Sequence, residues 1–375
     1  MKRAVIAYFL ALCLLLTGCG MGFEGDYLWQ QSHPMPDSAE SGQNISASDY
    51  ASLYDALRQA VEAGLPQVTI SVALYDRDAV ASDTAHAVTQ LRRFNPIAAY
   101  AVQDIQWKLG SIGGEQVLVV QLSYSCDQAH IRRIKAVENN EQAMEAIVSA
   151  LSGFDSGIVL RIRSYQEADF LQLVADFAAE NPHLVMEVPE VSASIYPETG
   201  KDRVVELKFS YLTSRDILRT MQQQVATVVD AAVDMVSFTQ DTRGKYTQMY
   251  ALLVERIQDY SLETSLTPAY SLLLYGVGDS KAFATVYAAM CRQAGLECLT
   301  VVGTFNSEPR YWNIVQIDGV YYHVDLLRSK DEGQFRDMTD EEMEGYVWYF
   351  PAYPTCGPRP EVPQPPEPED TVPED

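Results

Sequence analysis

The middle of the chain carries one pattern twice, and this duplication limits the possible folds more than any other feature. Residues 50–137 and 138–225 each read as a helix, a strand, a helix, two strands and a closing helix. Apolar side chains alternate along the predicted strands, as at Val68, Ile70 and Val72, and recur at helical spacing in the predicted helices. Each copy also has an Asn-Pro pair after its middle helix and a Ser-Tyr pair near its last strand. The pattern predicts two tandem small α+β repeats, each with a hairpin.

Neither copy gathers the residue types that catalysis needs. His86 and His130 lie on predicted helices, where we expect a solvated or capping role. Histidine, cysteine and carboxylate residues do not stand at catalytic spacing in either copy. Tandem small domains usually bind or space other molecules, an expectation that comes from the class of protein and not from these residues.

The N-terminus has the parts of a secretory signal. Lys2 and Arg3 precede an apolar run, residues 4–16, that is too short for a stable membrane span. The following stretch LTGC, which ends at Cys19, resembles a bacterial lipobox. The resemblance implies cleavage before Cys19 and a lipid on its sulfur, so that the mature chain is anchored to the cell membrane and faces outside the cytoplasm. The alternative is an ordinary signal peptide with an incidental cysteine.

Polar segments flank the predicted domains. With a signal peptide at residues 1–18, residues 19–49 read as a flexible tether, because they have no sustained apolar period. Residues 351–375 are rich in proline and acidic residues and are predicted to be extended and disordered. Residues 226–350, which begin with long helical stretches, remain as a third predicted domain.

Charge and cysteine content exclude some classes of function. A formal charge of -24 and a pI of about 4.5 argue against binding nucleic acid or anionic lipid through a broad basic face. Beyond the signal and its lipidation site, four cysteines remain, at positions that fit no zinc pattern: Cys126, Cys291, Cys298 and Cys356. Four cysteines allow three disulfide pairings, and buried free thiols are the favoured interpretation. No cofactor and no metal are predicted.

The third domain contains a stretch built like a nucleophile site. In YGVGDSKAFA, residues 275–284, a glycine-rich approach leads to a polar residue and then to an apolar run of helical period. Two strands around the turn Asp318-Gly319 are predicted further along.

Together these segments resemble the bacterial transglutaminase-like domains, which have a papain-like α+β fold. The resemblance covers residues 240–330, without a gap between Ala269 and Leu296. The matching positions are Ala269, Tyr270, Leu273, Gly276, Phe283, Ala284, Gly295, Leu296, Trp312, Asn313, Ile317, Asp318, Gly319, Tyr322, Val324 and Asp325. The family implies a cysteine that opens a helix, a histidine at the start of a hairpin and an aspartate at its end. It also implies acyl transfer or hydrolysis through a thioester.

Carried over residue by residue, the family triad is altered here. Ser280 stands at the cysteine position and Arg310 at the histidine position, while Asp325 is kept. A serine hydroxyl needs a general base, and a guanidinium, with a pKa above about 12, cannot serve as one. Losing one triad member costs on the order of 10⁴ in rate or more. We therefore expect a degenerate site in which Ser280 and Asp279 cap a helix and Arg310 pairs with Asp325.

One rewired site is the alternative. His323 lies two residues before Asp325, so both are expected on one face of a strand. A set of Ser280, His323 and Asp325 would make the protein a serine hydrolase or acyltransferase. Cys291 is no substitute nucleophile, because it lies roughly 16 Å from Ser280 along the helix axis, and Cys298 is predicted inside a core strand.

These observations predict a lipid-anchored pseudoenzyme that binds a peptide, a protein partner or cell-wall material. The predicted binding surface is the former substrate cleft, with Asp279, Trp312 and Asn313 beside the triad positions. There Arg310 is predicted to hold a ligand carboxylate. A purely structural surface protein, whose repeats bind while the third domain supports them, is the remaining possibility.

Overall fold

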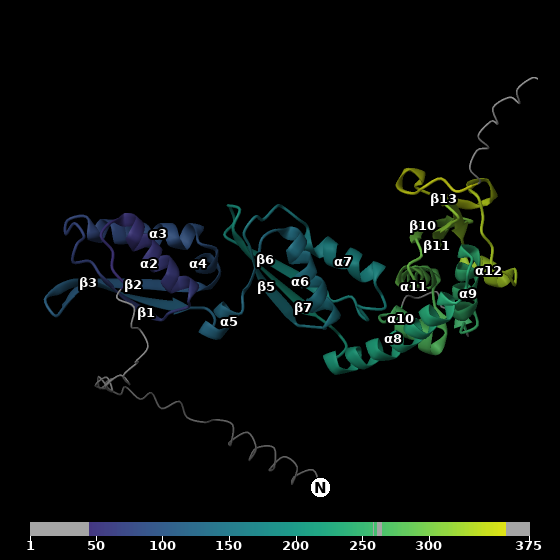
Figure 1. Ribbon diagram of the computed structural model, residues 1–375, viewed down its shortest axis with the longest axis horizontal. Coiled ribbons are helices and arrows are strands. Elements are labelled where there is room, and N and C mark those ends of the chain that lie inside the picture. The colour runs from purple at the N-terminus through teal and green to yellow at the C-terminus, as the bar shows by residue number, and fades with distance from the viewer. Residues whose placement is uncertain (1–44, 258, 261–264, 358–375) are drawn as a thin grey trace, which may run out of the picture. The chain divides into compact units, whose positions relative to one another are not determined.

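The computed structural model describes residues 45–257, 259–260 and 265–357. Its helices and strands intermix along the chain, which confirms the predicted α+β class (Figure 1). The predicted signal peptide, the lipidation site Cys19 and nearly all of the tether lie outside these residues. Among the described residues, none of the helices combines the length and the apolar character that crossing a bilayer requires.

The first sheet is antiparallel and has the strand order β1-β3-β2. Helices α2 and α3 lie on one face of it (Figure 1), and their apolar residues share a core with its strands. The elements of this unit are α2 (Tyr50–Glu62), β1 (Gln67–Ser71), α3 (Val80–Phe94), α4 (Pro96–Ala101), β2 (Val102–Ile112), β3 (Glu115–Tyr124) and α5 (Gln128–Arg132). Ala47, predicted in the tether, is buried here.

The second sheet has the order β4-β5-β7-β6 and a separate core with α6 and α7. Its elements are β4 (Lys135–Val137), α6 (Asn140–Ser152), β5 (Gly157–Ile162), α7 (Phe170–Glu180), β6 (Glu190–Tyr196) and β7 (Arg203–Ser210). In both sheets the second strand of the hairpin, β3 or β7, lies between its hairpin partner, β2 or β6, and an earlier strand of the chain, β1 or β5. This agreement is what a duplication would produce, but the duplication itself stays a prediction.

Two predicted boundaries of the repeats differ from the limits of the observed elements. The closing helix of the first copy, α5, is only five residues long. The residues after it form β4, which pairs in parallel with β5 and so belongs to the second sheet. The predicted boundary between residues 225 and 226 falls inside α8 (Arg215–Ser237). All five buried residues of α8 pack into the core of the C-terminal domain.

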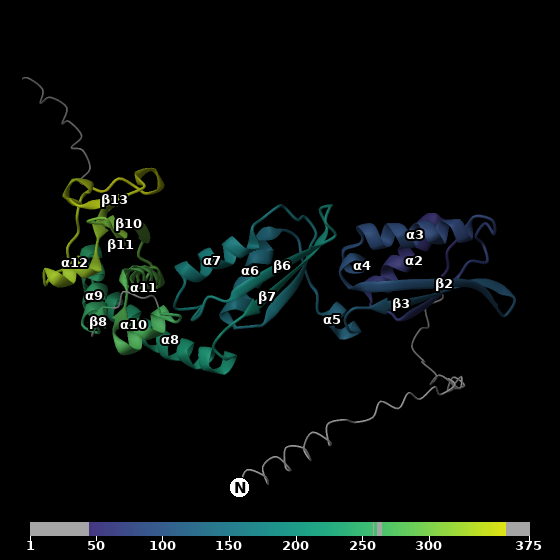
Figure 2. The same ribbon diagram turned by 180° about the vertical axis from the view of Figure 1, so that it is seen from behind.

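The C-terminal domain has a four-stranded sheet of order β12-β11-β10-β13, with α11 packed against β10 and β11 (Figure 2). Every residue of α11 from Ala282 to Cys291 is buried, which marks it as the central helix. The helices are α9 (Thr242–Val254), α10 (Pro268–Tyr275), α11 (Ser280–Gln293) and α12 (Leu326–Asp331). The strands are β8 (Asp259–Tyr260), β9 (Val277–Gly278), β10 (Cys298–Phe305), β11 (Glu308–Ile317), β12 (Val320–Val324) and β13 (Tyr346–Trp348).

The end of this domain extends beyond its predicted limit. Residues 351–357, predicted as part of a disordered tail, pack onto the domain. Cys356 is buried, and its backbone N–H donates to Asp340 Oδ2 at 3.0 Å. The rest of the predicted tail, residues 358–375, lies outside the described residues.

Candidate functional site

The start of α11 is fixed by two local features. Gly276 ends α10 in the left-handed conformation, with φ of 70°, which glycine adopts without a steric penalty. Asp279 then caps α11, because its Oδ1 accepts from Ala282 N at 2.8 Å. Ser280 is therefore the first helical residue, the place that the family resemblance gives to the nucleophile.

The Ser280 hydroxyl is bonded to the backbone of the neighbouring strand β11. Ser280 is buried, and its Oγ accepts from Tyr311 N at 3.3 Å. Among the residues that the structure describes, no histidine or carboxylate is hydrogen-bonded to this oxygen. The space between Ser280, Tyr311 and Asp325 also leaves no volume that a water molecule could occupy. The Ser280 hydroxyl is therefore enclosed on this side, and its described hydrogen bond is to a backbone N–H.

Arg310 and Asp325 form the predicted ion pair, which is confirmed in bidentate form. Arg310 Nε donates to Asp325 Oδ2 at 2.7 Å, and Arg310 Nη2 donates to Oδ1 at 2.8 Å. Only 1% of Asp325 is exposed, and three further donors satisfy its carboxylate. These are Leu327 N at 3.0 Å, Arg328 N at 3.1 Å and the Tyr346 hydroxyl at 2.8 Å. Asp325 therefore caps α12 and fastens β11 and β13 around it.

Sequence reasoning missed Tyr346. Its hydroxyl reaches Asp325 across 21 residues of chain, from the edge strand β13. Burial, with the nearby Asp325 carboxylate, raises the pKa of Tyr346, so the hydroxyl stays a neutral donor. No spacing in the sequence connects the two residues, because only the pairing of β13 with β10 brings them together.

His323 contacts neither Ser280 nor Asp325 in the described hydrogen bonds. Trp312 Nε1 donates to His323 Nδ1 at 3.0 Å, and His323 Nε2 lies 2.9 Å from Asp340 Oδ1. The ring is fully buried, and this burial lowers its pKa, although Asp340 opposes the shift. With both ring nitrogens engaged, the hydrogen bonds do not support His323 as the base of a rewired site.

His323, Asp340 and Cys356 place three ligand-type atoms within 4.8 Å of one another. Because Trp312 donates to Nδ1, the proton of the neutral ring is on Nε2, which then donates to Asp340. A metal would need a lone pair on Nε2 instead. Burial raises the pKa of the Cys356 thiol to about 12, which also disfavours the metal-binding thiolate. In this cluster Asp340 is hydrogen-bonded to His323 of β12 and to the backbone of Cys356. These bonds hold the C-terminal segment against β12.

Trp312 and Asn313 lie inside the domain, and this burial does not support their predicted role as ligand contacts, which stays a prediction. Trp312 is 1% exposed and Asn313 is fully buried. Asn313 Nδ2 donates to the carbonyl oxygens of Ala284 and Leu299, which ties β11 to α11 and β10. Cys291 is also fully buried, and burial raises its thiol pKa well above the ordinary value, as expected for an inert residue. Within the described residues the four cysteines are free thiols.

The surface beside Arg310 does not favour an anionic ligand. A hollow of about 680 Å³ opens there. Three carboxylates, those of Asp331, Glu332 and Glu344, share its lining with the guanidinium groups of Arg310 and Arg328. Two nitrogens of Arg310 are bonded to Asp325. The charges on this lining therefore do not support the predicted capture of a ligand carboxylate by Arg310.

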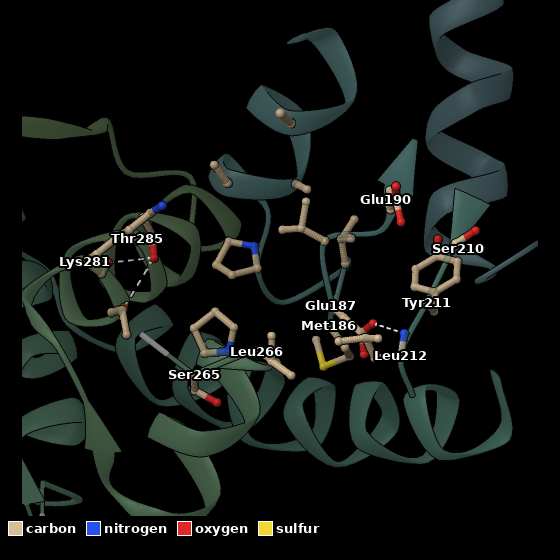
Figure 3. A pocket seen from close by; sticks show the side chains of 18 residues that line it. Met186, Glu187, Glu190, Ser210, Tyr211, Leu212, Ser265, Leu266, Lys281 and Thr285 are labelled. Atoms are coloured by element: carbon tan, nitrogen blue, oxygen red, sulfur yellow. Dashed lines mark hydrogen bonds between the residues drawn. The ribbon is translucent and has the colours of Figure 1, made fainter. Parts of the chain in front are cut away.

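A more apolar cavity lies on another side of α11. It has a volume of about 600 Å³, and residues of α7, α11 and the segments 182–190, 210–212 and 265–268 line it (Figure 3). Lys281, the residue after Ser280, is part of its wall. Sequence analysis could not reveal this cavity, because its walls come from two predicted domains.

Comparison with known proteins identifies one part of the chain. Residues 229–326 match the family described as the transglutaminase-like superfamily. The chain therefore contains a transglutaminase-like domain, as the resemblance predicts. A search of curated proteins found no match.

Three solved structures are similar at low identity. One is a protein named as a TGase, 11% identical, with 51% of this chain and 58% of that chain covered and a TM-score of 0.25. A candidate cysteine protease from Cytophaga hutchinsonii is 13% identical, with coverages of 43% and 71% and a TM-score of 0.25. A candidate protease from Parabacteroides distasonis is 8% identical, with coverages of 68% and 39% and a TM-score of 0.23. Scores this low add no argument to the family match.

Proposed function

We propose that this protein is a membrane-anchored extracytoplasmic lipoprotein whose transglutaminase-like domain is not catalytic. Its role would be to bind a peptide, a protein or another ligand of the cell envelope. The LTGC stretch at residues 16–19 supports the anchor, and the degenerate triad supports the loss of catalysis.

The observation that carries this proposal is the bidentate pair between Arg310 and Asp325. In a working triad the aspartate orients a histidine, which takes and returns a proton. Here the same carboxylate is saturated by a guanidinium, which stays protonated, and by three further donors. The geometry that once served proton transfer would then serve only to hold β11, β13 and α12 together.

Labelling with a fluorophosphonate probe tests the loss of catalysis. The soluble form, residues 45–357, is incubated with the probe beside a Ser280→Ala variant, and both proteins are shown to be folded by circular dichroism. We expect equal background labelling, because the Ser280 hydroxyl lacks a base. Labelling of the natural protein that disappears in the variant would show an activated serine and overturn the proposal.

The lipid anchor is tested separately in bacterial cells fed an alkyne-bearing fatty acid. The full chain should incorporate the label and enter the detergent phase on extraction, whereas a Cys19→Ser variant should do neither. Equal behaviour of the two chains would leave an ordinary signal peptide as the explanation of residues 1–18.

A further inference from the structure

We propose that the cavity between α7 and α11 binds an alkyl chain that ends in a carboxylate, with the carboxylate at Lys281. This inference specifies the ligand for the binding role proposed above. It rests on that proposal only for the role that ligand binding would have in the cell. It also moves the ligand away from the former substrate cleft, which has no space for one. The argument depends on the walls of the cavity, on its rim and on its charges.

Many of the side chains that line the cavity are small or apolar. Helix α7 presents Ala175, Ala178 and Ala179 to the cavity, so this face of the helix leaves space where larger side chains would fill it. Val185 and Met186, both buried, also line the cavity. At about 600 Å³ the cavity falls within the range of ~300–1,000 Å³ that is usual for small-molecule sites.

The rim exposes large apolar side chains to water. Val188 is 53% exposed, Leu266 62% and Leu212 83%, although all three line the cavity. Side chains of this kind gain free energy when a ligand covers them, and exposed apolar residues gathered at a hollow mark binding sites. An apolar chain laid across Leu266 and Leu212 would cover both (Figure 3).

Lys281 gives the cavity a charged end. Its ammonium lies 5.9 Å from the centre of the Tyr311 ring, and within the described residues no carboxylate pairs with it. The other charged residues described on this lining, Glu187 and Glu190, are acidic, so an anion would be attracted to the cavity only at the Lys281 ammonium. The position of Lys281 in the first turn of α11 adds to this attraction.

The other polar groups of the lining set the direction of the ligand. The buried Glu187 carboxylate accepts from the backbone N–H groups of Leu212 and Thr213, which satisfy its oxygens and leave its negative charge in place. Glu190 is exposed and lies at the opposite end of the cavity from Lys281 (Figure 3). A ligand carboxylate would be repelled at Glu190 and attracted at Lys281, with the alkyl chain between them.

The test measures binding of 11-(dansylamino)undecanoic acid, an apolar chain with a carboxylate and a fluorophore that brightens in apolar surroundings. Titration of residues 45–357 should give a saturable increase in fluorescence. Lys281→Met should weaken binding about tenfold, because one charge-assisted contact is lost. Lys108→Met, which removes an exposed lysine outside the cavity, should change nothing.

Two further variants test the cavity itself. Ala175→Trp, at an exposed position of α7, fills the space, and Leu212→Glu puts a negative charge on the apolar rim. Each should weaken binding more than tenfold while thermal unfolding stays as in the natural protein. Because the two sites are on different segments, one variant remains informative if the other fails to fold.

Several results would overturn the proposal. The first is that the probe shows no saturable binding. The second is that both Ala175→Trp and Leu212→Glu bind the probe as tightly as the natural protein does. The third is that Lys281→Met does so. Dodecanoate should displace the probe better than dodecan-1-ol does, and better than an apolar tetrapeptide with a free C-terminus. Stronger displacement by the peptide would assign the cavity to a protein ligand instead. None of these results bears on fluorophosphonate labelling, so the failure of this inference is distinguishable from the failure of the proposed function.

Discussion

Asp325, which stands at the position of the family aspartate, has a structural role in this domain. A carboxylate that is 1% exposed is tolerated only when donors surround it, and five donor atoms do so here. An unpaired charge at this depth would cost several kcal/mol. Arg310, at the position of the family histidine, supplies two of these donors, so the charge of Asp325 is paired.

Tyr346 contributes to this network independently of Arg310. The change Tyr346→Phe removes one hydrogen bond to a buried charged group and should lower the free energy of unfolding by about 2 kcal/mol. Tyr349→Phe, at a hydroxyl-bearing side chain that is 71% exposed, is the matched control and should have no effect. Urea unfolding of the natural protein and of the two variants measures their free energies of unfolding. Equal losses in both variants, or none in either, would remove Tyr346 from the account.

The sequence predicts the residues at this scale only where they lie in family motifs. Aligned positions were sufficient to predict the cap at Asp279 and the pair between Arg310 and Asp325. They give no sign that Trp312 and Asn313 are buried, because this burial arises from the place of β11 as an inner strand that packs against α11. A motif position on such a strand is conspicuous in the sequence and still inaccessible to a ligand.

At the scale of elements, the contact between the second sheet unit and the C-terminal domain is the main departure from expectation. The sequence pattern divides α8 at residue 225, because the first half of the helix continues a repeat-like pattern. Its buried side chains nevertheless face the C-terminal core, and Phe154 and Met186 of the second unit join the same cluster. Local periodicity identifies a helix, but it does not say which neighbour the helix packs against.

His183, in the segment after α7, makes this contact sensitive to acid. Burial, with Arg292 nearby, lowers the pKa of His183 from 6.5 to about 4. Between these values the unfolded chain binds the extra proton and the folded one does not, so the free energy of unfolding falls as pH drops from about 6.5 to about 4. The expected loss is ~2–3 kcal/mol. Urea unfolding of the natural protein at a series of pH values measures it.

A His183→Gln variant is the control for this pH dependence. It removes the titrating group at this site, so its stability should vary less between pH 6.5 and 4 than that of the natural protein. Some dependence should persist, because burial also lowers the pKa of His323. Identical slopes in the two proteins would show that His183 does not carry the effect.

At the scale of the whole molecule, α8 decides where the C-terminal domain can be cut. A fragment of residues 213–357 keeps Leu218 and Val225 in the core, whereas a fragment of residues 226–357 loses both. The shorter fragment should be less stable by on the order of 3–5 kcal/mol, as for the loss of large core side chains. Thermal unfolding followed by circular dichroism compares them. Similar midpoints would mean that the predicted boundary at residue 226 is adequate after all.

The whole-molecule organisation was predictable to the extent that each unit has its own sequence pattern. The two sheet units and the transglutaminase-like domain each possess a core of their own. What the sequence could not show is the cavity of about 600 Å³, because its walls meet only when α7 and α11 are brought together. A cavity that is lined by two units depends on how the units pack against each other. The sequence pattern of one segment does not predict that packing.

The central claim is that the pair of Arg310 and Asp325 now supports the fold and no longer supports catalysis. A double-mutant cycle tests it directly, with Arg310→Met, Asp325→Asn and the two changes combined, measured by urea unfolding. The account predicts a favourable coupling of more than ~1.5 kcal/mol, because each single change leaves a buried partner behind. A coupling near zero would contradict it, since the two residues would then stabilise the domain independently of each other.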